Sequence, residues 1–316
     1  MLKNTSRPMS RKLFQTLLLG SAAVLAIATL HAQTAAADPA TACSAKNQSD
    51  SVKVGVFTFI TYASNTGACL QVVSGGKVVF SRAVDSFQSF TLGQPAVAED
   101  NIPAVANGAD VTGRGHPDMI VSLFTGGAHC CTSHFVFELA PAFRLLATIN
   151  DSDDDLAHFQ LDPRDHRYNY YTADWTFAYW PTCFACSPSE LVILRYAEDA
   201  NGGAFHLAFD RMRKPAPSPA QWSREITAVH TAVSKKAVDD IGQALWGVVL
   251  DLIYTGHSDL AWKFVDEAGS AAQQKPFPAL SDFCSLLKKS PYWPDLARTL
   301  QNAPPACIGA KSAVSQ

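Results

Sequence analysis

Eight cysteines constrain the fold of this 316-residue chain more than any other feature of its sequence. None lies in the first 42 residues, and they occur at Cys43, Cys69, Cys130, Cys131, Cys183, Cys186, Cys284 and Cys307. An even number of cysteines in an exported chain is most simply a set of disulfides. Counting does not determine the connectivity, because eight cysteines allow roughly a hundred pairings. Locality favours Cys43 with Cys69 and Cys284 with Cys307, which leaves the other four in the middle of the chain.

The first residues have the pattern of an export signal. A positively charged segment carries Lys3, Arg7, Arg11 and Lys12. An apolar run over Leu17–Leu30 and the small residues of HAQTAAAD follow it. The run is shorter than the ~20 apolar residues that span a bilayer. We therefore expect a signal peptide over residues 1–37, cleaved after Ala32 or Ala37, and a periplasmic or secreted protein. The alternatives are an uncleaved membrane anchor or a lipid anchor on Cys43.

The charge of the remaining chain argues against nucleic-acid binding. Removing residues 1–37 takes four basic residues and no acidic ones, so 21 Lys and Arg face 28 Asp and Glu, a net charge of −7. A nucleic-acid partner would require a clustered basic face. No later stretch is apolar enough for a membrane span, so we expect none after signal cleavage. The remaining length suits one large or two ordinary domains.

Short alternating runs predict a β-rich domain over residues 44–210. Val52, Val54 and Val56 alternate with polar or small residues. Gly75 and Gly76 separate CLQVV from VVF, which predicts a hairpin because glycine supplies the positive φ of tight turns. Residues 86–108 have weak periodicity and predict a surface segment. Further strands are expected over 119–124, 135–139, 143–149, 190–196 and 204–209.

The pattern becomes helical after a proline-rich stretch. Residues 211–221, RMRKPAPSPAQ, predict a linker. Beyond it, Ile241, Leu245 and Leu252 recur at helical spacing, and Gly256 is placed to end that helix. Ser258 and Ser281 are expected to cap two more helices. Residues 222–316 are thus predicted as a small helical domain with a structural role, and partner docking is the alternative. The expected fold class is α+β.

The segment 110–121, DVTGRGHPDMIV, joins a turn to an apolar run. Its motif residues are Asp110, Gly113, Gly115, Pro117 and Asp118, followed by Met119, Ile120 and Val121. This pattern resembles the FG-GAP or VCBS-type repeat of β-propeller proteins, which implies blade strands and a calcium loop. Residues 44–210 are too few for seven blades, so we expect a few blade-like sheets or a sandwich. A degenerate second copy begins at Asp162, without the glycines.

In the calcium loop that the resemblance implies, Asp110, Thr112 and Asp118 would supply the oxygen ligands. Oxygens at alternating positions can converge on a hard cation where glycine allows a sharp bend. Arg114 occupies the central acidic position, where a guanidinium would repel or replace the ion. The alternative is a turn held by Asx-type hydrogen bonds.

Two further groups of residues could hold a metal. Asp151, Asp153 and Asp155, with Asp162, form a second calcium-like pattern, whose alternative is a solvated acidic loop. His129, Cys130, Cys131 and His134, with Cys183 and Cys186, are ligands that zinc or copper prefers. An oxidising compartment favours disulfides for these cysteines, and a redox-active pair is a third possibility. We expect no cofactor, with calcium or a transition metal as the alternatives.

The aromatic run over residues 168–184 is the candidate ligand surface. Trp175, Phe177 and Tyr179 are expected on one strand face, where aromatic rings could stack on a sugar, and Asp174 could add a polar contact. The alternative is that these rings are core.

The sequence contains no recognised catalytic motif. It has no Gly-x-Ser-x-Gly elbow, no His-Glu-x-x-His and no phosphate-binding glycine loop. We expect a non-catalytic binding module for an extracytoplasmic protein or a carbohydrate, with Thr125–His134 and the aromatic run as its contact surface. One alternative is a metal-dependent or hydrolytic enzyme that uses His129 and the central cysteines. A thiol-redox protein is the other.

Overall fold

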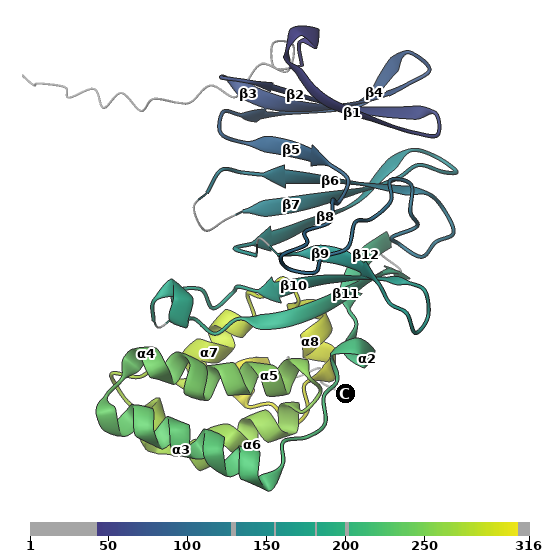
Figure 1. The fold of residues 1–316 in the computed structure, drawn as a ribbon. Helices are drawn as coiled ribbons and strands as arrows, with labels where there is room; N and C mark the ends of the chain where they lie inside the picture. The colour runs from purple at the N-terminus through teal and green to yellow at the C-terminus, as the bar shows by residue number, and fades with distance from the viewer. Residues whose placement is uncertain (1–42, 128–130, 155, 181, 200–201, 309–316) are drawn as a thin grey trace, which may run out of the picture. The chain divides into compact units, whose positions relative to one another are not determined.

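A computed structural model describes residues 43–127, 131–154, 156–180, 182–199 and 202–308 (Figure 1). After a single 3-10 turn, η1 (Ala45–Asn47), the described chain forms three four-stranded antiparallel sheets. The first contains β1 (Gln48–Val54), β2 (Phe57–Ser64), β3 (Gly67–Ser74) and β4 (Lys77–Asp85). The second contains β5 (Ser89–Leu92), β6 (Asp118–Phe124), β7 (Thr132–Glu138) and β8 (Arg144–Ser152). The third contains β9 (His158–Leu161), β10 (Tyr168–Asp174), β11 (Glu190–Asp199) and β12 (Gly202–Leu207).

Each sheet is built from strands that are consecutive in the sequence. The predicted hairpin is present between β3 and β4, where Gly75 and Gly76 have φ values of 56° and 75°. Strand β5 lies within residues 86–108, for which the sequence predicted no strand. It is only four residues long and has two buried or half-buried side chains, too few for alternation to reveal it. The relationship of these sheets to FG-GAP blades stays a prediction.

The second sheet is covered on both faces, which explains the nearly continuous apolar run in β6. Met119 and Val121 pack with Phe59 of the first sheet. Ile120 points to the other face, into a cluster that includes Tyr170 of the third sheet. Successive side chains of a strand point to opposite faces, so a strand that is buried on both faces needs apolar residues at most positions.

The C-terminal part is helical, as predicted, and covers the third sheet (Figure 1). Its first elements are α2 (Phe209–Met212), α3 (Pro219–Lys235), α4 (Val238–Ile241), the π-helical η3 (Gly242–Gly247), α5 (Val248–Tyr254) and α6 (Ser258–Ala268). The remaining elements are η4 (Ser270–Gln273), α7 (Leu280–Leu287), α8 (Trp293–Thr299) and α9 (Pro305–Ile308).

Helices occupy both ends of the predicted linker. Helix α2 extends to Met212, and α3 begins at Pro219 with a capping box formed by Ser218 and Gln221. Proline is favoured in the first turn of a helix because its missing N–H would have no partner there. Ser258 and Ser281 lie inside their helices, whose cap residues are His257 and Ala279.

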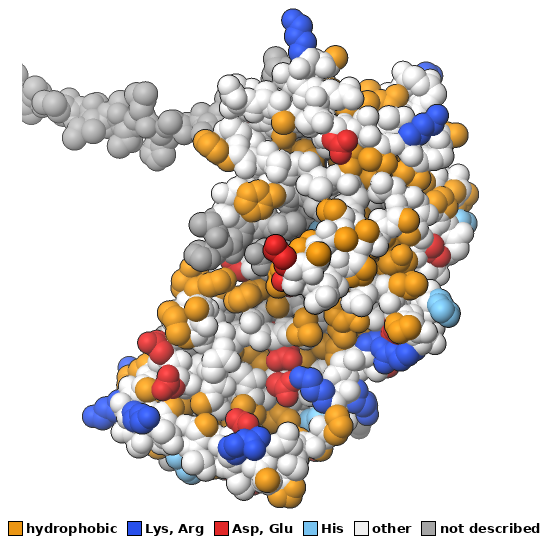
Figure 2. Space-filling view, in the orientation of Figure 1, with side chains coloured by type: hydrophobic (Ala, Val, Ile, Leu, Met, Phe, Trp, Pro, Cys, Tyr) orange, Lys and Arg blue, Asp and Glu red, His pale blue; other side chains and the backbone are white. Residues whose placement is uncertain are grey.

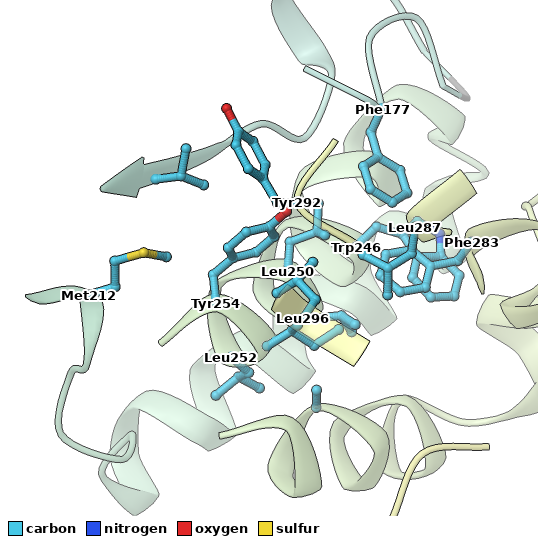
Figure 3. Close-up of a cluster of buried hydrophobic side chains, with 14 of the residues drawn as sticks. Phe177, Met212, Trp246, Leu250, Leu252, Tyr254, Phe283, Leu287, Tyr292 and Leu296 are labelled. Atoms are coloured by element: carbon cyan, nitrogen blue, oxygen red, sulfur yellow. The ribbon is translucent and has the colours of Figure 1, made fainter. Parts of the chain in front are cut away.

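The helices and the third sheet share one hydrophobic cluster. Phe177 follows β10, and its ring centre lies 5.1 Å from that of Phe283 on α7. Trp246 on η3 stacks on Phe283 at 4.7 Å, and all three side chains are fully buried (Figure 3). Burying a large apolar side chain contributes roughly 1.5–3 kcal/mol, so this cluster fixes the helices on the sheet.

Both terminal disulfides predicted from locality are present. Cys43 bonds to Cys69, and Cys284 bonds to Cys307. Cys183 bonds to Cys186, and Cys131 is also disulfide-bonded. Cys130 and the predicted signal peptide lie outside the described residues. Within the described ranges, no helix combines the length and apolar character that a bilayer crossing requires.

Candidate functional site

The turn at residues 110–118 is closed by its own carboxylates. Asp110 accepts hydrogen bonds from the backbone N–H groups of Arg114 and Gly115, at 2.9 and 2.8 Å. Asp118 accepts from the backbone N–H and the hydroxyl of Thr112, at 2.9 and 2.8 Å. Burial raises the pKa of Asp118 to about 6, although these hydrogen bonds oppose the shift. The three predicted calcium ligands therefore come together, but as an Asx-type turn.

Arg114 places a positive charge in this turn. Its guanidinium lies 3.2 Å from Glu138 of β7 and 3.1 Å from Glu198 of β11. The Glu138 side chain is only 1% exposed, so it requires a compensating charge. No cluster of three or more His, Cys, Asp or Glu with the arrangement of a metal site occurs in the part of the chain that the structure describes.

The acidic residues of the second calcium-like pattern have different partners. Asp151 is buried and accepts a hydrogen bond from Tyr170 at 2.6 Å. Asp162 lies 2.7 Å from Arg164 and 3.1 Å from Arg195, and the Arg164 hydrogen bonds hold its pKa well below the usual range. Asp155 lies outside the described residues. Asp162 is thus already neutralised by protein cations.

Strand β10 ends at Asp174, so the expected aromatic strand face does not form. The Asp174 carboxylate accepts from the backbone N–H of Thr176 at 2.9 Å, an Asx turn that stops the strand. Asp174 is also buried and accepts from Tyr254 at 2.5 Å and Ser290 at 2.7 Å. Phe177 belongs to the core described above, so neither Asp174 nor Phe177 presents a surface to a ligand.

Three other side chains form an aromatic cluster beside the Cys183–Cys186 disulfide. Phe184 stacks on Trp175, with ring centres 4.9 Å apart and planes 9° apart. Tyr179 lies 5.4 Å from Phe184 and is 62% exposed. We call Trp175, Tyr179 and Phe184 the aromatic turn. Figure 2 shows hydrophobic side chains over the sheets on the face drawn.

The aromatic turn is anchored at several points. The backbone N–H of Tyr179 donates to the Ser187 hydroxyl at 2.7 Å, which in turn donates to the Cys183 carbonyl at 2.9 Å. Thr182 donates to Asp239 of α4 at 2.6 Å, and Gln243 of η3 donates to the Ser187 carbonyl at 2.7 Å. The disulfide encloses Phe184. These bonds hold the exposed ring of Tyr179 and the half-buried rings of Trp175 and Phe184 in a defined position.

His134, a predicted metal ligand, is buried in a polar chain. Its Nδ1 lies 2.9 Å from the hydroxyl of Ser122, which is directly opposite on β6. Its Nε2 lies 3.2 Å from Oδ2 of Asp151, whose other oxygen accepts from Tyr170. Burial lowers the pKa of His134 to about 4 and raises that of Asp151 to about 8. His129 lies outside the described residues.

A cavity of about 230 Å³ adjoins this polar chain. Its walls include Ser122, Phe124, Thr132, His134, Asp154 and His158. No sequence pattern indicated Ser122 as a site residue or predicted a contact between His134 and Asp151. Ser122 gave no distinct signal, because the face of β6 that carries it and Ile120 also carries the polar Asp118. Its partners come from other strands and have no local signature.

Comparison with known proteins adds no relative. No family model matches the chain, and neither a curated protein nor a solved structure matches it. The function must therefore be argued from the geometry of the sites.

Proposed function

We propose that the protein is an extracytoplasmic binding module that holds a carbohydrate on the aromatic turn. The observation that carries this proposal is the 62% exposed ring of Tyr179, set against Phe184 and Trp175 on a disulfide-closed turn. Aromatic rings offer a large apolar face at a low entropic cost, which suits the flat apolar face of a sugar ring.

The rigidity of the turn supports a binding role. Tyr179 has a positive φ of 60°, which is uncommon for a large side chain and is held here by the hydrogen bond to Ser187. A ring that is already positioned loses little freedom on binding, so more of the contact energy appears as affinity. Disulfides persist in oxidising compartments, which supports a periplasmic or secreted location.

The proposal is tested by screening the mature protein on a printed glycan array and measuring the bound glycans by titration calorimetry. Tyr179→Ala should weaken binding at least about tenfold, because a central aromatic contact at an interface contributes about 1.4 kcal/mol or more. Leu191→Ala is the matched control, since Leu191 is 59% exposed on β11 and should leave the affinity unchanged.

Two outcomes would contradict the carbohydrate proposal. One is the absence of any glycan bound above background by the oxidised protein. The other is equal affinity of Tyr179→Ala and the unaltered protein for every glycan that binds.

A further inference from the structure

Strands β6, β7 and β8 bring a serine, a histidine and an aspartate into one chain of contacts. The Ser122 hydroxyl lies 2.9 Å from His134 Nδ1, and His134 Nε2 lies 3.2 Å from Asp151 Oδ2. Tyr170 donates to the other Asp151 oxygen at 2.6 Å. A nucleophile, a base and an acid that orients the base are the parts from which serine hydrolases are built. Here Nδ1 faces the serine and Nε2 the aspartate.

Ser122 has access to the cavity. It is half-buried, and both Ser122 and His134 line the space of about 230 Å³. The hydroxyl of Thr132 and the ring of Phe124, which is 45% exposed, belong to the same wall. A small acyl group fits a cavity of this size, and Thr132 can donate a hydrogen bond to its carbonyl oxygen.

His134 is neutral at the working pH, and the imidazolium that it would form by accepting a proton needs the charge of the ionised Asp151 to offset its burial. Burial lowers its pKa to about 4, so the imidazole is neutral above that pH. In the tautomer that carries its proton on Nε2, the ring accepts a hydrogen bond from the Ser122 hydroxyl at Nδ1 and directs Nε2–H toward Asp151. His134 is 6% exposed, and its Nε2 lies 3.2 Å from Asp151 Oδ2 without the alignment of a hydrogen bond, so the proposed reaction requires this contact to tighten when substrate binds.

We propose that Ser122 is the nucleophile of a hydrolytic site for esters of small carboxylic acids, with His134 as its base and Asp151 as a positioning residue. The Ser122 oxygen bonds to the ester carbonyl carbon, and its proton passes to His134 Nδ1. The ester C–O bond breaks, and the leaving alcohol takes that proton. Water then attacks the acyl-serine, gives a proton to Nδ1, and releases the acid as Ser122 regains its proton. This site is independent of the aromatic turn.

The charged form of Asp151 should control the pH dependence of the reaction. Asp151 faces His134 from β7, Tyr170 from β10, Asp154 from the following turn, and Tyr292. Burial raises its pKa to about 8, and the imidazolium formed during attack requires the ionised carboxylate. The rate of acylation should therefore rise as the pH rises through about 8, and Asp151→Asn should remove that rise.

The experiment uses a fluorescent alkyl fluorophosphonate on the oxidised mature protein between pH 6 and 9, with the modified residue located by peptide mass spectrometry. We expect one adduct, on Ser122, in the unaltered protein and in Ser133→Ala, the matched control on β7. Ser122→Ala should give no adduct and should lower kcat/KM for p-nitrophenyl acetate by about 100-fold or more.

Labelling of the unaltered protein tests whether Ser122 is a nucleophile, and this test does not depend on the folding of a variant. Absence of an adduct at every pH, or an adduct only at another residue, would overturn the proposal. So would equal p-nitrophenyl acetate turnover by Ser122→Ala and the unaltered protein, with circular dichroism spectra that match.

Discussion

Buried carboxylates in this protein are accommodated in different ways. Asp162 is surrounded by arginines, and the Arg164 hydrogen bonds hold its pKa below the usual range. Asp118 instead accepts hydrogen bonds from the backbone N–H and the hydroxyl of the neutral Thr112, and burial raises its pKa to about 6. Desolvation penalises the charged form. At Asp162 the charged hydrogen bonds from Arg164 outweigh this penalty, whereas at Asp118 the hydrogen bonds from the neutral Thr112 do not. The same residue type therefore titrates in opposite directions at two buried positions.

The raised pKa of Asp118 predicts a pH-dependent stability. A carboxyl whose pKa is higher in the folded protein stabilises the fold in its protonated form. This stabilisation is fully present below the unfolded-state pKa of 3.8, and it is lost as the pH rises through the folded-state pKa of about 6. Between pH 4 and 7, the protein should lose up to about 3 kcal/mol of unfolding free energy relative to Asp118→Asn. Urea unfolding of both proteins across this range measures the difference. A difference that is constant with pH would exclude this role of Asp118.

At the scale of elements, the turn at residues 110–118 connects two sheets through one guanidinium. Arg114 contacts Glu138 of the second sheet and Glu198 of the third. Gly113 has a φ of 71°, and a Cβ there would lie 2.9 Å from Nε of Arg167. Glycine suits that position chiefly because the positive φ is uncommon for other residues, and the side chain of Arg167, just before β10, lies against it. The turn is thus held to the third sheet by contacts that need no ion.

Removing the Arg114 guanidinium should destabilise the protein without creating a calcium requirement. Arg114→Met leaves the buried Glu138 paired with Arg144, which lies 2.7 Å away, and should cost about 1–3 kcal/mol of unfolding free energy. Lys263→Met is the control, because Lys263 and Glu267 form an exposed pair that contributes about 0–1 kcal/mol. Thermal unfolding with EDTA and with millimolar calcium measures both effects. A melting temperature that rises with calcium in the unaltered protein would support the predicted calcium loop at residues 110–118.

At the scale of the whole molecule, disulfides join positions near both ends of the described chain. The Cys284–Cys307 bond is fully buried in the cluster shared by the helices and the third sheet. Cys69 is fully buried on β3 and bonds to Cys43, just before η1. A crosslink stabilises chiefly by restricting the unfolded chain, so both bonds act on the protein as a whole.

The two terminal disulfides should contribute similar stability. Their cysteines are separated by 26 and 23 residues, and loop entropy predicts about 3 kcal/mol for each. The double variants Cys43→Ser/Cys69→Ser and Cys284→Ser/Cys307→Ser should therefore lose comparable unfolding free energy in guanidinium. A loss confined to one variant would show that packing around the sulfurs, rather than loop closure, sets their contribution.

The sequence alone determined the features that depend on neighbouring residues. Alternation and short apolar runs revealed most of the strands, helical spacing revealed the C-terminal helices, and locality gave Cys43–Cys69 and Cys284–Cys307. The same local patterns gave a wrong prediction for residues 175–179. Their composition is typical of a strand, but the Asp174 side chain ends the strand before them. A side-chain hydrogen bond of this kind competes with the strand ladder and is invisible to periodicity.

Only the tertiary structure decided which side chains meet. Ser122, His134 and Asp151 come together through the register of three strands and the irregular pairing of β7 with β8. Asp174 meets Tyr254 and Ser290, which lie 80 and 116 residues further along the chain. Periodicity specifies which face of an element is buried, but not which partner covers it, because apolar burial is non-directional. The candidate sites therefore depend on how the sheets and helices pack together.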